Sequence, residues 1–207
     1  MTSLRSERRK SKRKTKEKDS QTTMSLTLAT LIPGLLFLLL GGALLLNNSG
    51  VISLLKGLPR STGATYLLFG AGTAAFLYQI WHLSPADFGD HRGLLFIGFA
   101  VLAALSFYCV PDFLAVRGLC VLVLVGALPL LDAAFMEYDH PQRLFMVTPV
   151  FLALALAIWL GAQPWRLRDF FEWLFRPGGS RARLLGGVLV GYGLLLAGVA
   201  FTYGTSA

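Results

Sequence analysis

Outside the first 23 residues, most of the histidine, aspartate and glutamate side chains, which could do chemistry, lie in two short segments. They are "WHLSPADFGDHRG", from 81 to 93, and "MEYDHPQR", from 136 to 143. Imidazole and carboxylate groups are suitable ligands for first-row metal ions. If the fold brings the two segments together, the candidate ligands are His82, Asp87, Asp90, His91, Glu137, Asp139 and His140.

The spacing of these residues supports a metal site only weakly. Asp87 and His91 are the only pair with the i, i+4 spacing of one helix face, and Gly89 between them disfavours a helix. Aspartate and proline are also typical of turns for their own backbone reasons. Ordinary turn formation is therefore the alternative, and the spacing favours it over a metal site.

A second candidate for chemistry is an acidic residue inside an apolar run. Asp132 is the one acid within the long apolar runs, and Gln79 lies near the matching end of another run. An acid within a membrane is costly, and such residues often belong to a proton or ion pathway. Both residues lie near the end of their run, so a hydrogen-bonded contact between helices is the alternative, and the one that this position favours.

The sequence lacks the motifs of the common enzyme classes. It has no Walker lysine loop, no GxGxxG opening a helix, no HExxH and no GxSxG. The apolar runs contain no histidine, which disfavours a haem held by two histidines. The segments between the runs are too short for a soluble catalytic domain. We therefore expect neither enzymatic activity nor a cofactor.

The elements that must position these residues are membrane helices. Of the 207 residues, 55% are hydrophobic and 14% are charged, whereas about a quarter are charged in an average soluble domain. Runs of about 17–25 apolar residues can cross a bilayer as helices. The sequence predicts an all-α integral membrane protein with a six-helix bundle in one domain, residues 24–207. The predicted spans are Met24–Leu46, Ala64–Trp81, Gly93–Val110, Gly118–Met136, Leu144–Gly161 and Leu184–Tyr203.

The first 23 residues form a separate basic segment. They contain nine lysines and arginines against three acids. Such a segment cannot bury enough apolar surface to fold alone, so we expect a disordered, solvated tail. Electrostatic attachment to anionic lipid headgroups is its candidate function. Nucleic acid is a less favoured partner, because basic tails beside a first span commonly set membrane orientation.

The basic residues give conflicting predictions of orientation. Six spans would place Lys56, Arg60, Arg117, Arg166, Arg168, Arg176, Arg181 and Arg183 on one side, and Arg92 and Arg143 with both termini on the other. The positive-inside rule applied to the loops puts the termini outside, whereas the nine tail charges reverse this result. A re-entrant first span, or translation from Met24, would remove the conflict. We favour cytoplasmic arginine-rich loops, by a narrow margin, in a bacterial inner membrane.

The segment from 164 to 176, "PWRLRDFFEWLFR", combines five aromatic rings with arginine. It is too short and too charged to span a bilayer, but as a helix it has a broad apolar arc and a polar edge. This pattern predicts an amphipathic helix lying in the membrane interface. The helix either seals the edge of the bundle or recruits a partner or lipid. Its candidate interfacial residues are Trp165, Arg166, Arg168, Phe170, Phe171, Trp173 and Arg176.

Small residues and cysteines suggest how the helices pack. Gly187, Gly191 and Gly198 share one face of the last span, and small residues let membrane helices approach closely. We expect them to pack within the bundle, with a homo-oligomer as the alternative. Cys109 and Cys120 flank one loop; buried cysteines usually act as small hydrophobes, and a disulfide between them would require an oxidising compartment.

These patterns favour a non-enzymatic membrane protein over a catalyst. We expect a scaffold or assembly subunit that packs with itself or with a larger membrane complex. The alternative is a small permease or ion-coupled transporter that uses Asp132, Gln79 and the segments rich in histidine and aspartate. The glycine face, the amphipathic helix and the missing catalytic motifs support the first hypothesis.

Overall fold

The computed structural model describes residues 24–84, 87–110, 112–176 and 180–203, and these contain helices and no strand. The predicted basic tail lies outside these residues. Five helices are long and apolar enough to cross a membrane, so the chain is an all-α, multi-pass integral membrane protein. They are α2 (Leu26–Leu46), α6 (Arg92–Cys109), α7 (Leu114–Ala134), α8 (Leu144–Ala162) and α10 (Ser180–Tyr203).

The predicted span from 64 to 81 is helical but divided. It comprises α4 (Thr62–Ala64), a π-helical turn η2 (Thr65–Phe69) and α5 (Gly70–Trp81), which follow one another without a gap. α7 crosses at this turn: a Cβ atom added to Gly118 would collide with the backbone of Phe69, and one added to Gly72 would lie 2.8 Å from the carbonyl oxygen of Gly118. The π-turn leaves only 12 residues in α5 itself.

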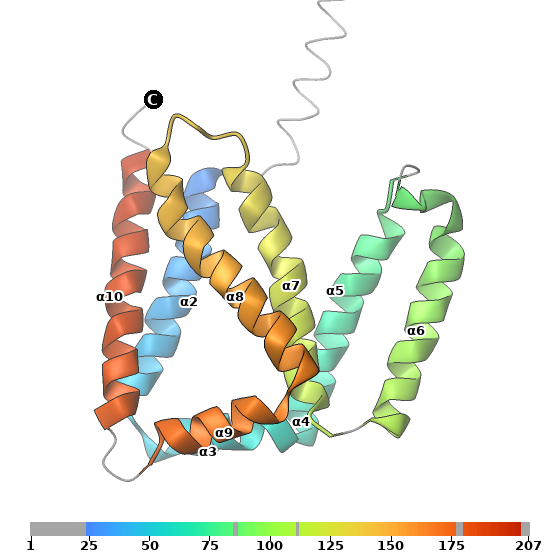
Figure 1. Ribbon diagram of the computed structural model, residues 1–207, viewed down its shortest axis with the longest axis horizontal. Helices are drawn as coiled ribbons and strands as arrows, with labels where there is room; N and C mark the ends of the chain where they lie inside the picture. Colours follow the sequence, from blue (N-terminus) through green and yellow to red (C-terminus); the bar gives the residue numbers. More distant parts are fainter. Residues whose placement is uncertain (1–23, 85–86, 111, 177–179, 204–207) are drawn as a thin grey trace, which may run out of the picture.

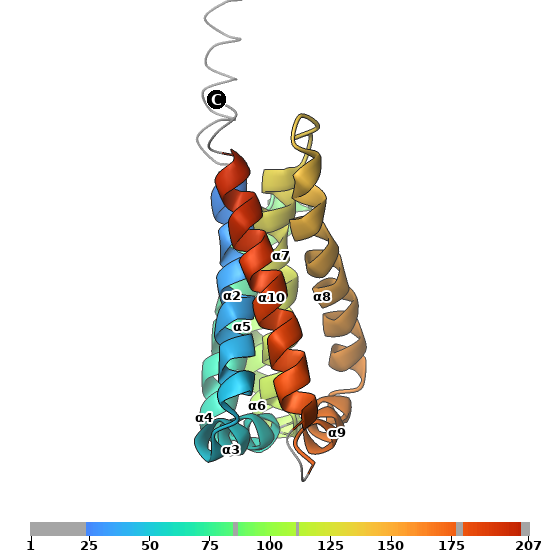
Figure 2. The ribbon, with the colours of Figure 1, turned by 90° about the vertical axis from the view of Figure 1, so that its left-hand side faces the viewer.

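Two short helices lie across one end of the bundle (Figures 1 and 2). They are α3 (Ser49–Gly57) and α9 (Trp165–Leu174). Asn47 ends α2 in the left-handed conformation and the side chain of Asn48 caps α3, so two residues turn the chain from one helix into the next. Pro164 also breaks the chain between α8 and α9, because the residue preceding a proline is disfavoured in the α conformation. Short 3₁₀ turns complete the described elements: η1 (Leu58–Arg60), η4 (Gly89–His91) and η5 (Pro141–Arg143).

Helices α2 and α10 form an antiparallel pair with close backbone contact. Gly34 and Gly41 of α2 face Gly193 and Gly186 of α10. A Cβ atom added to Gly41 would lie 2.8 Å from the carbonyl oxygen of Gly186, and one added to Gly193 would lie 2.9 Å from that of Gly34. α2 runs unbroken through Pro33 and Gly41, so the first span is not re-entrant.

The α2–α10 pair and the α7–α8 pair form a wedge. At one end a single core cluster joins them, with Ala29, Ala127, Met146 and Leu196 buried together. Toward the other end the pairs diverge, and α9 bridges the gap (Figure 1). Leu174 of α9 packs with Leu44 and Ala182 of the first pair, and Leu167 packs against Val116, Cys120 and Ala157 of the second.

Helices α5 and α6 form a hairpin on the outer side of α7. Aromatic rings join the two helices along their length: Phe96 meets Trp81 at a centroid distance of 5.6 Å, Phe99 meets Phe76 at 5.2 Å, and Phe107 meets Phe69 at 5.2 Å. No residue of α6 is buried. Its outer face is therefore available to lipid.

A tyrosine hydroxyl replaces a backbone bond that a proline removes from α8. Pro149 has no N–H, so the carbonyl of Phe145, four residues earlier, lacks its usual helical donor. The hydroxyl of Tyr192 on α10 donates to this carbonyl at 2.8 Å. Membrane helices tolerate proline where a neighbouring group supplies the missing bond.

The Tyr192→Phe variant should lose about 1 kcal/mol of unfolding free energy, the range of one hydrogen bond between membrane helices. Titration of the purified protein with SDS in mild detergent would measure this loss. Tyr108→Phe is the control, because Tyr108 is 88% exposed and should change little. Equal unfolding free energies for Tyr192→Phe and the wild type would show that the bond adds nothing to stability.

Candidate functional site

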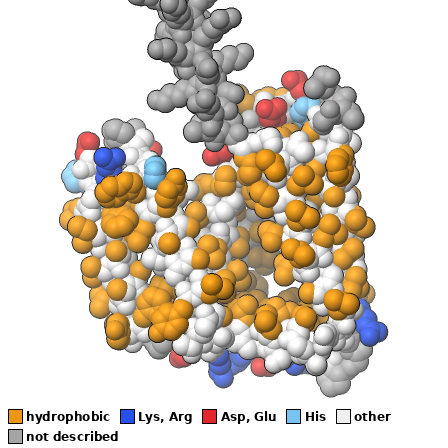
Figure 3. Space-filling view, turned by 180° about the vertical axis from the view of Figure 1, so that it is seen from behind, with side chains coloured by type: hydrophobic (Ala, Val, Ile, Leu, Met, Phe, Trp, Pro, Cys, Tyr) orange, Lys and Arg blue, Asp and Glu red, His pale blue; other side chains and the backbone are white. Residues whose placement is uncertain are grey.

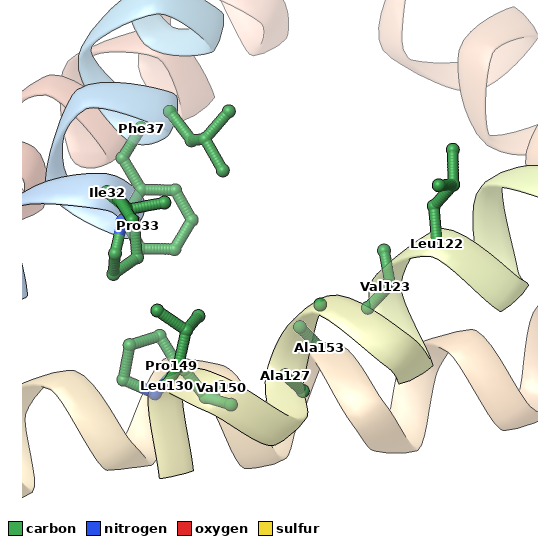
Figure 4. Close-up of a pocket in the computed structure, with 12 residues that line it drawn as sticks. Ile32, Pro33, Phe37, Leu122, Val123, Ala127, Leu130, Pro149, Val150 and Ala153 are labelled. Atoms are coloured by element: carbon green, nitrogen blue, oxygen red, sulfur yellow. The ribbon is translucent and has the colours of Figure 1, made fainter. Parts of the chain in front are cut away.

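An apolar hollow lies inside the wedge, between the α2–α10 pair and α7, with α8 along one side (Figures 3 and 4). Its volume is about 340 Å³. The residues of α2, α7 and α8 around it are aliphatic, proline and phenylalanine side chains with small residues between them. The lining residues are Ile32, Pro33, Leu36, Phe37, Leu122, Val123, Gly126, Ala127, Leu130, Pro149, Val150 and Ala153.

The wall of the hollow is suited to hydrocarbon. None of its twelve side chains is charged or carries a polar atom. A polar solute entering it would lose its hydrogen bonds to water without gaining others, at a cost of several kcal/mol. An aliphatic or aromatic group would instead gain the dispersion contacts that an unfilled space lacks.

The charged residues divide between the two ends of the molecule. The end covered by α3 and α9, called the basic end here, holds eight basic residues and three acids, Asp112, Asp169 and Glu172. Among the described residues, the opposite, acidic end holds two arginines, five acids and the three histidines. In Figure 3 the histidine side chains lie above the apolar belt and lysine and arginine side chains lie mostly below it, while acidic side chains are visible at both ends.

The predicted amphipathic segment forms α9, which has two apolar sides. Leu174 is 2% exposed, and Phe171 packs with it against α2 and α10. Trp165, Phe170 and Trp173 remain 41–46% exposed on the outside. One side of α9 therefore seals the bundle while the other presents aromatic rings outward.

The arginines around α9 contact amide, acidic and aromatic side chains at the basic end. Arg166 donates to the Gln163 side chain at 3.1 Å, and Arg168 pairs with Asp169 at 2.9 Å and with Glu172 at 3.7 Å. Arg181, in the first turn of α10, lies over the ring of Trp173 at 4.9 Å. Arg176 is exposed beyond the last residue of α9.

The histidine and aspartate segments both lie at the acidic end but stand apart (Figure 1). Among the described residues, no group of three metal-ligating side chains comes together. His82 contacts the carbonyl oxygen of Tyr78 through Nδ1 at 2.8 Å, and Asp87 accepts from Ser84 at 2.8 Å. His140 packs on the ring of Tyr203. The remaining candidate ligands, Asp90, His91, Glu137 and Asp139, are exposed.

Asp132 and Gln79 take no part in the hollow. Asp132 is exposed near the end of α7, and Gln79 is half-buried near the end of α5. Neither side chain lines the hollow. Within the described part of the chain, no hydrogen bond or ion pair joins them.

The cysteines and glycines that the sequence analysis singled out also lie in different environments. Cys120 is buried against α8 and Cys109 is exposed, and both thiols are free. Gly187, Gly191 and Gly198 face outward, with no atom within 4 Å of an added Cβ. This differs from the expected packing within the bundle, since Gly186 and Gly193 make the contact with α2. The predicted contact with a second copy stays open.

No protein-family model, curated protein or solved structure matches the chain. The candidate site therefore rests on the chemistry of the hollow and of the two ends alone.

The residues that build the hollow were missed because each is an ordinary apolar residue. A signal for the helix pair beside it was nevertheless present. Gly34 and Gly41, like Gly186 and Gly193, are seven residues apart, a spacing that returns to nearly the same helix face. Two such pairs in the first and last spans indicate a close contact between them.

Proposed function

We propose that this protein is a non-enzymatic scaffold or assembly subunit of a membrane complex, and that the hollow receives apolar side chains from a partner's transmembrane helix. The wholly apolar wall of the hollow carries this proposal. Association in lipid depends on close packing rather than on the hydrophobic effect. A partner that fills the hollow gains contacts which loosely ordered lipid tails supply less completely.

A permease is less well supported by the same observation. Asp132 and Gln79 lie outside the hollow, and its wall offers a polar solute no hydrogen-bond partner. A transport pathway would need polar groups along its length.

The proposed placement in the membrane uses six spans. The helical stretch from 62 to 81 is long enough at about 1.5 Å per residue to cover about 30 Å as the sixth span. α3 and α9 then lie in the interface, where the arginines of the basic end meet anionic lipid headgroups. We place this end at the cytoplasmic face of a bacterial inner membrane, in accordance with the positive-inside rule applied to the loops.

The Gly126→Phe variant should remove the partner from the hollow. Gly126 lines the hollow and has no atom within 4 Å of an added Cβ, so a phenyl group there fills the space without a clash. The wild type, solubilised from its own membrane in mild detergent, should elute as a complex larger than one chain. Gly126→Phe should retain about tenfold less partner, as expected for the loss of a buried anchor.

Gly98→Phe is the matched control, because Gly98 is exposed on α6 and also lacks a neighbour within 4 Å. It should elute as the wild type does. A wild type that elutes as a single chain, or a Gly126→Phe variant that keeps its partner, would refute the proposed function.

A further inference from the structure

A second cavity, of about 320 Å³, lies at the basic end between the start of the α4–α5 segment and the corner from α6 to α7. Unlike the hollow, it has polar and charged walls. Its lining residues are Arg60, Thr62, Thr65, Tyr66, Phe107, Asp112, Phe113 and Leu114. Arg60 and Asp112, which are far apart in the sequence, both line this space. No ion pair joins them within the described residues.

A more apolar groove lies next to this cavity, along the α5–α6 hairpin. It has a volume of about 220 Å³ and is lined by Phe69, Thr73, Phe76, Phe99, Leu102, Ala103, Ser106 and Val121. Phe107 of the cavity contacts Phe69 of the groove at a ring distance of 5.2 Å. Ser106, the neighbour of Phe107, turns its hydroxyl to the carbonyl of Leu102 at 2.8 Å, which leaves the groove apolar.

We propose that the cavity and the groove together bind one phospholipid whose headgroup carries a primary amine, such as phosphatidylethanolamine. The headgroup lies in the cavity at the level of α3 and α9, and one acyl chain follows the groove toward the membrane centre. The site lies on the α5–α6 side of α7 and uses none of the residues of the hollow. It is therefore independent of the proposed scaffold function.

The charges of the cavity select the headgroup. Arg60, with the hydroxyl group of Thr62 nearby, suits a phosphodiester. The Thr65 hydroxyl donates to the carbonyl of Ser61 at 3.0 Å instead. Asp112 suits an ammonium group and would repel a purely anionic headgroup. A zwitterion satisfies both unpaired charges at once, which neither an anionic nor a neutral headgroup can do.

The aromatic rings favour a primary amine over choline. Binding of a quaternary ammonium ion uses open ring faces. Tyr66 stacks on Phe107 at 5.4 Å with an interplanar angle of 18°, and the Arg60 guanidinium lies over Phe113 at 5.9 Å. One face of each of these rings is thus already covered, which leaves no cage of open faces for a quaternary ammonium ion, whereas the Asp112 carboxylate can accept hydrogen bonds from a primary ammonium.

Lipid binding to the full chain, purified in mild detergent and depleted of lipid, can be measured by native mass spectrometry. Phosphatidylethanolamine, phosphatidylglycerol and phosphatidylcholine with identical acyl chains should be supplied in equal amounts. We expect one phosphatidylethanolamine to be retained in preference to the other two. Free phosphoethanolamine at the same concentration should bind far more weakly, because it lacks the chain that occupies the groove.

Variants at the two charges should act differently. Arg60→Gln should weaken retention of phosphatidylethanolamine about tenfold, the loss expected for one charge-assisted bond. Asp112→Asn should reverse the preference toward phosphatidylglycerol, since it removes both the ammonium partner and the repulsion of an anion. Arg92→Gln is the matched control: Arg92 lies over Trp81 at 5.9 Å at the acidic end, as Arg60 lies over Phe113.

Three results would overturn this site. Equal retention of all three lipids would show non-selective annular binding. A preference for phosphatidylglycerol that Asp112→Asn leaves unchanged would show a simple anion site. Losses of equal size in Arg60→Gln and Arg92→Gln would show that the effect does not arise in this cavity. A monodisperse elution profile for each variant ensures that misfolding is not the cause.

Discussion

Replacing Gly186 by alanine should destabilise the protein by about 1–3 kcal/mol, the usual cost of overpacking a close contact, and replacing it by leucine should prevent α10 from pairing with α2. The added Cβ would lie 2.8 Å from the carbonyl oxygen of Gly41 and 2.9 Å from the amide nitrogen of Leu45. These are backbone atoms, which cannot rotate away as a side chain can. The helices must separate, and the contacts along their whole length weaken together. Unfolding in SDS would measure the alanine variant, and the yield of monodisperse protein the leucine variant.

Gly187 provides a control one residue away. It has no atom within 4 Å of an added Cβ, so Gly187→Ala and Gly187→Leu should leave the unfolding free energy unchanged or raise it slightly, because helix propensity improves. The pair Gly41→Ala and Gly42→Ala repeats the comparison from the other helix, since Gly42 is also unobstructed. Similar losses at both members of either pair would contradict the close contact described for α2 and α10.

Gly118→Ala should loosen the α5–α6 hairpin from α7. Its methyl group would collide with the backbone of Phe69 in the π-turn, so the two helices must move apart. We expect a loss of about 1–3 kcal/mol. Because α6 is held mainly through α5, the first unfolding step in SDS should then be release of the hairpin. Accelerated protease cleavage between α6 and α7 would report that release.

Gly126→Ala tests the same substitution two turns further along α7. Gly126 lies opposite empty space, so this variant should unfold at the wild-type SDS concentration and keep the wild-type cleavage rate. If Gly118→Ala also behaves as the wild type, the crossing at the π-turn is looser than the backbone positions indicate.

Helix existence and length followed from the sequence because lipid imposes a strict rule on the backbone. An apolar run in lipid must satisfy its own hydrogen bonds, and only a helix does so within one segment. α8 is an example: it is predicted from 144 to 161 and observed as Leu144–Ala162, so its bounds differ by one residue. The segment from 164 to 176 also forms a helix, α9 (Trp165–Leu174), which begins directly after Pro164; its place in the membrane interface stays a prediction.

Which side of each helix is buried could not be predicted as well as where the helix begins and ends. α10 is apolar all round, and such a helix carries no periodic signal for its buried side. Gly187 and Gly191 have the familiar four-residue spacing but face outward, whereas Gly186 and Gly193 make the contact. The π-turn could not be predicted either, because nothing in "TYLLF" differs from ordinary helical sequence. It lies where Gly118 brings the backbone of α7 against it.

The candidate site shows the limit of searching by reactive residue types. Histidine and aspartate drew attention to two loops that stand apart in the fold. The hollow contains neither, and only three-dimensional packing reveals where the helices fail to meet. Arg60 and Asp112, far apart in the sequence, become neighbours across a cavity only because α7 brings their two loops to the same end.

The position of α9 makes it a bridge between the two halves of the wedge (Figure 1). Its two ends are anchored in different halves, through Leu174 and Leu167, while the other ends of these halves are fastened together. The internal width between the halves is therefore coupled to the position and tilt of α9. If α9 lies in the membrane interface as proposed, a change in its depth or tilt would therefore alter the width of the hollow through the ten residues of this helix.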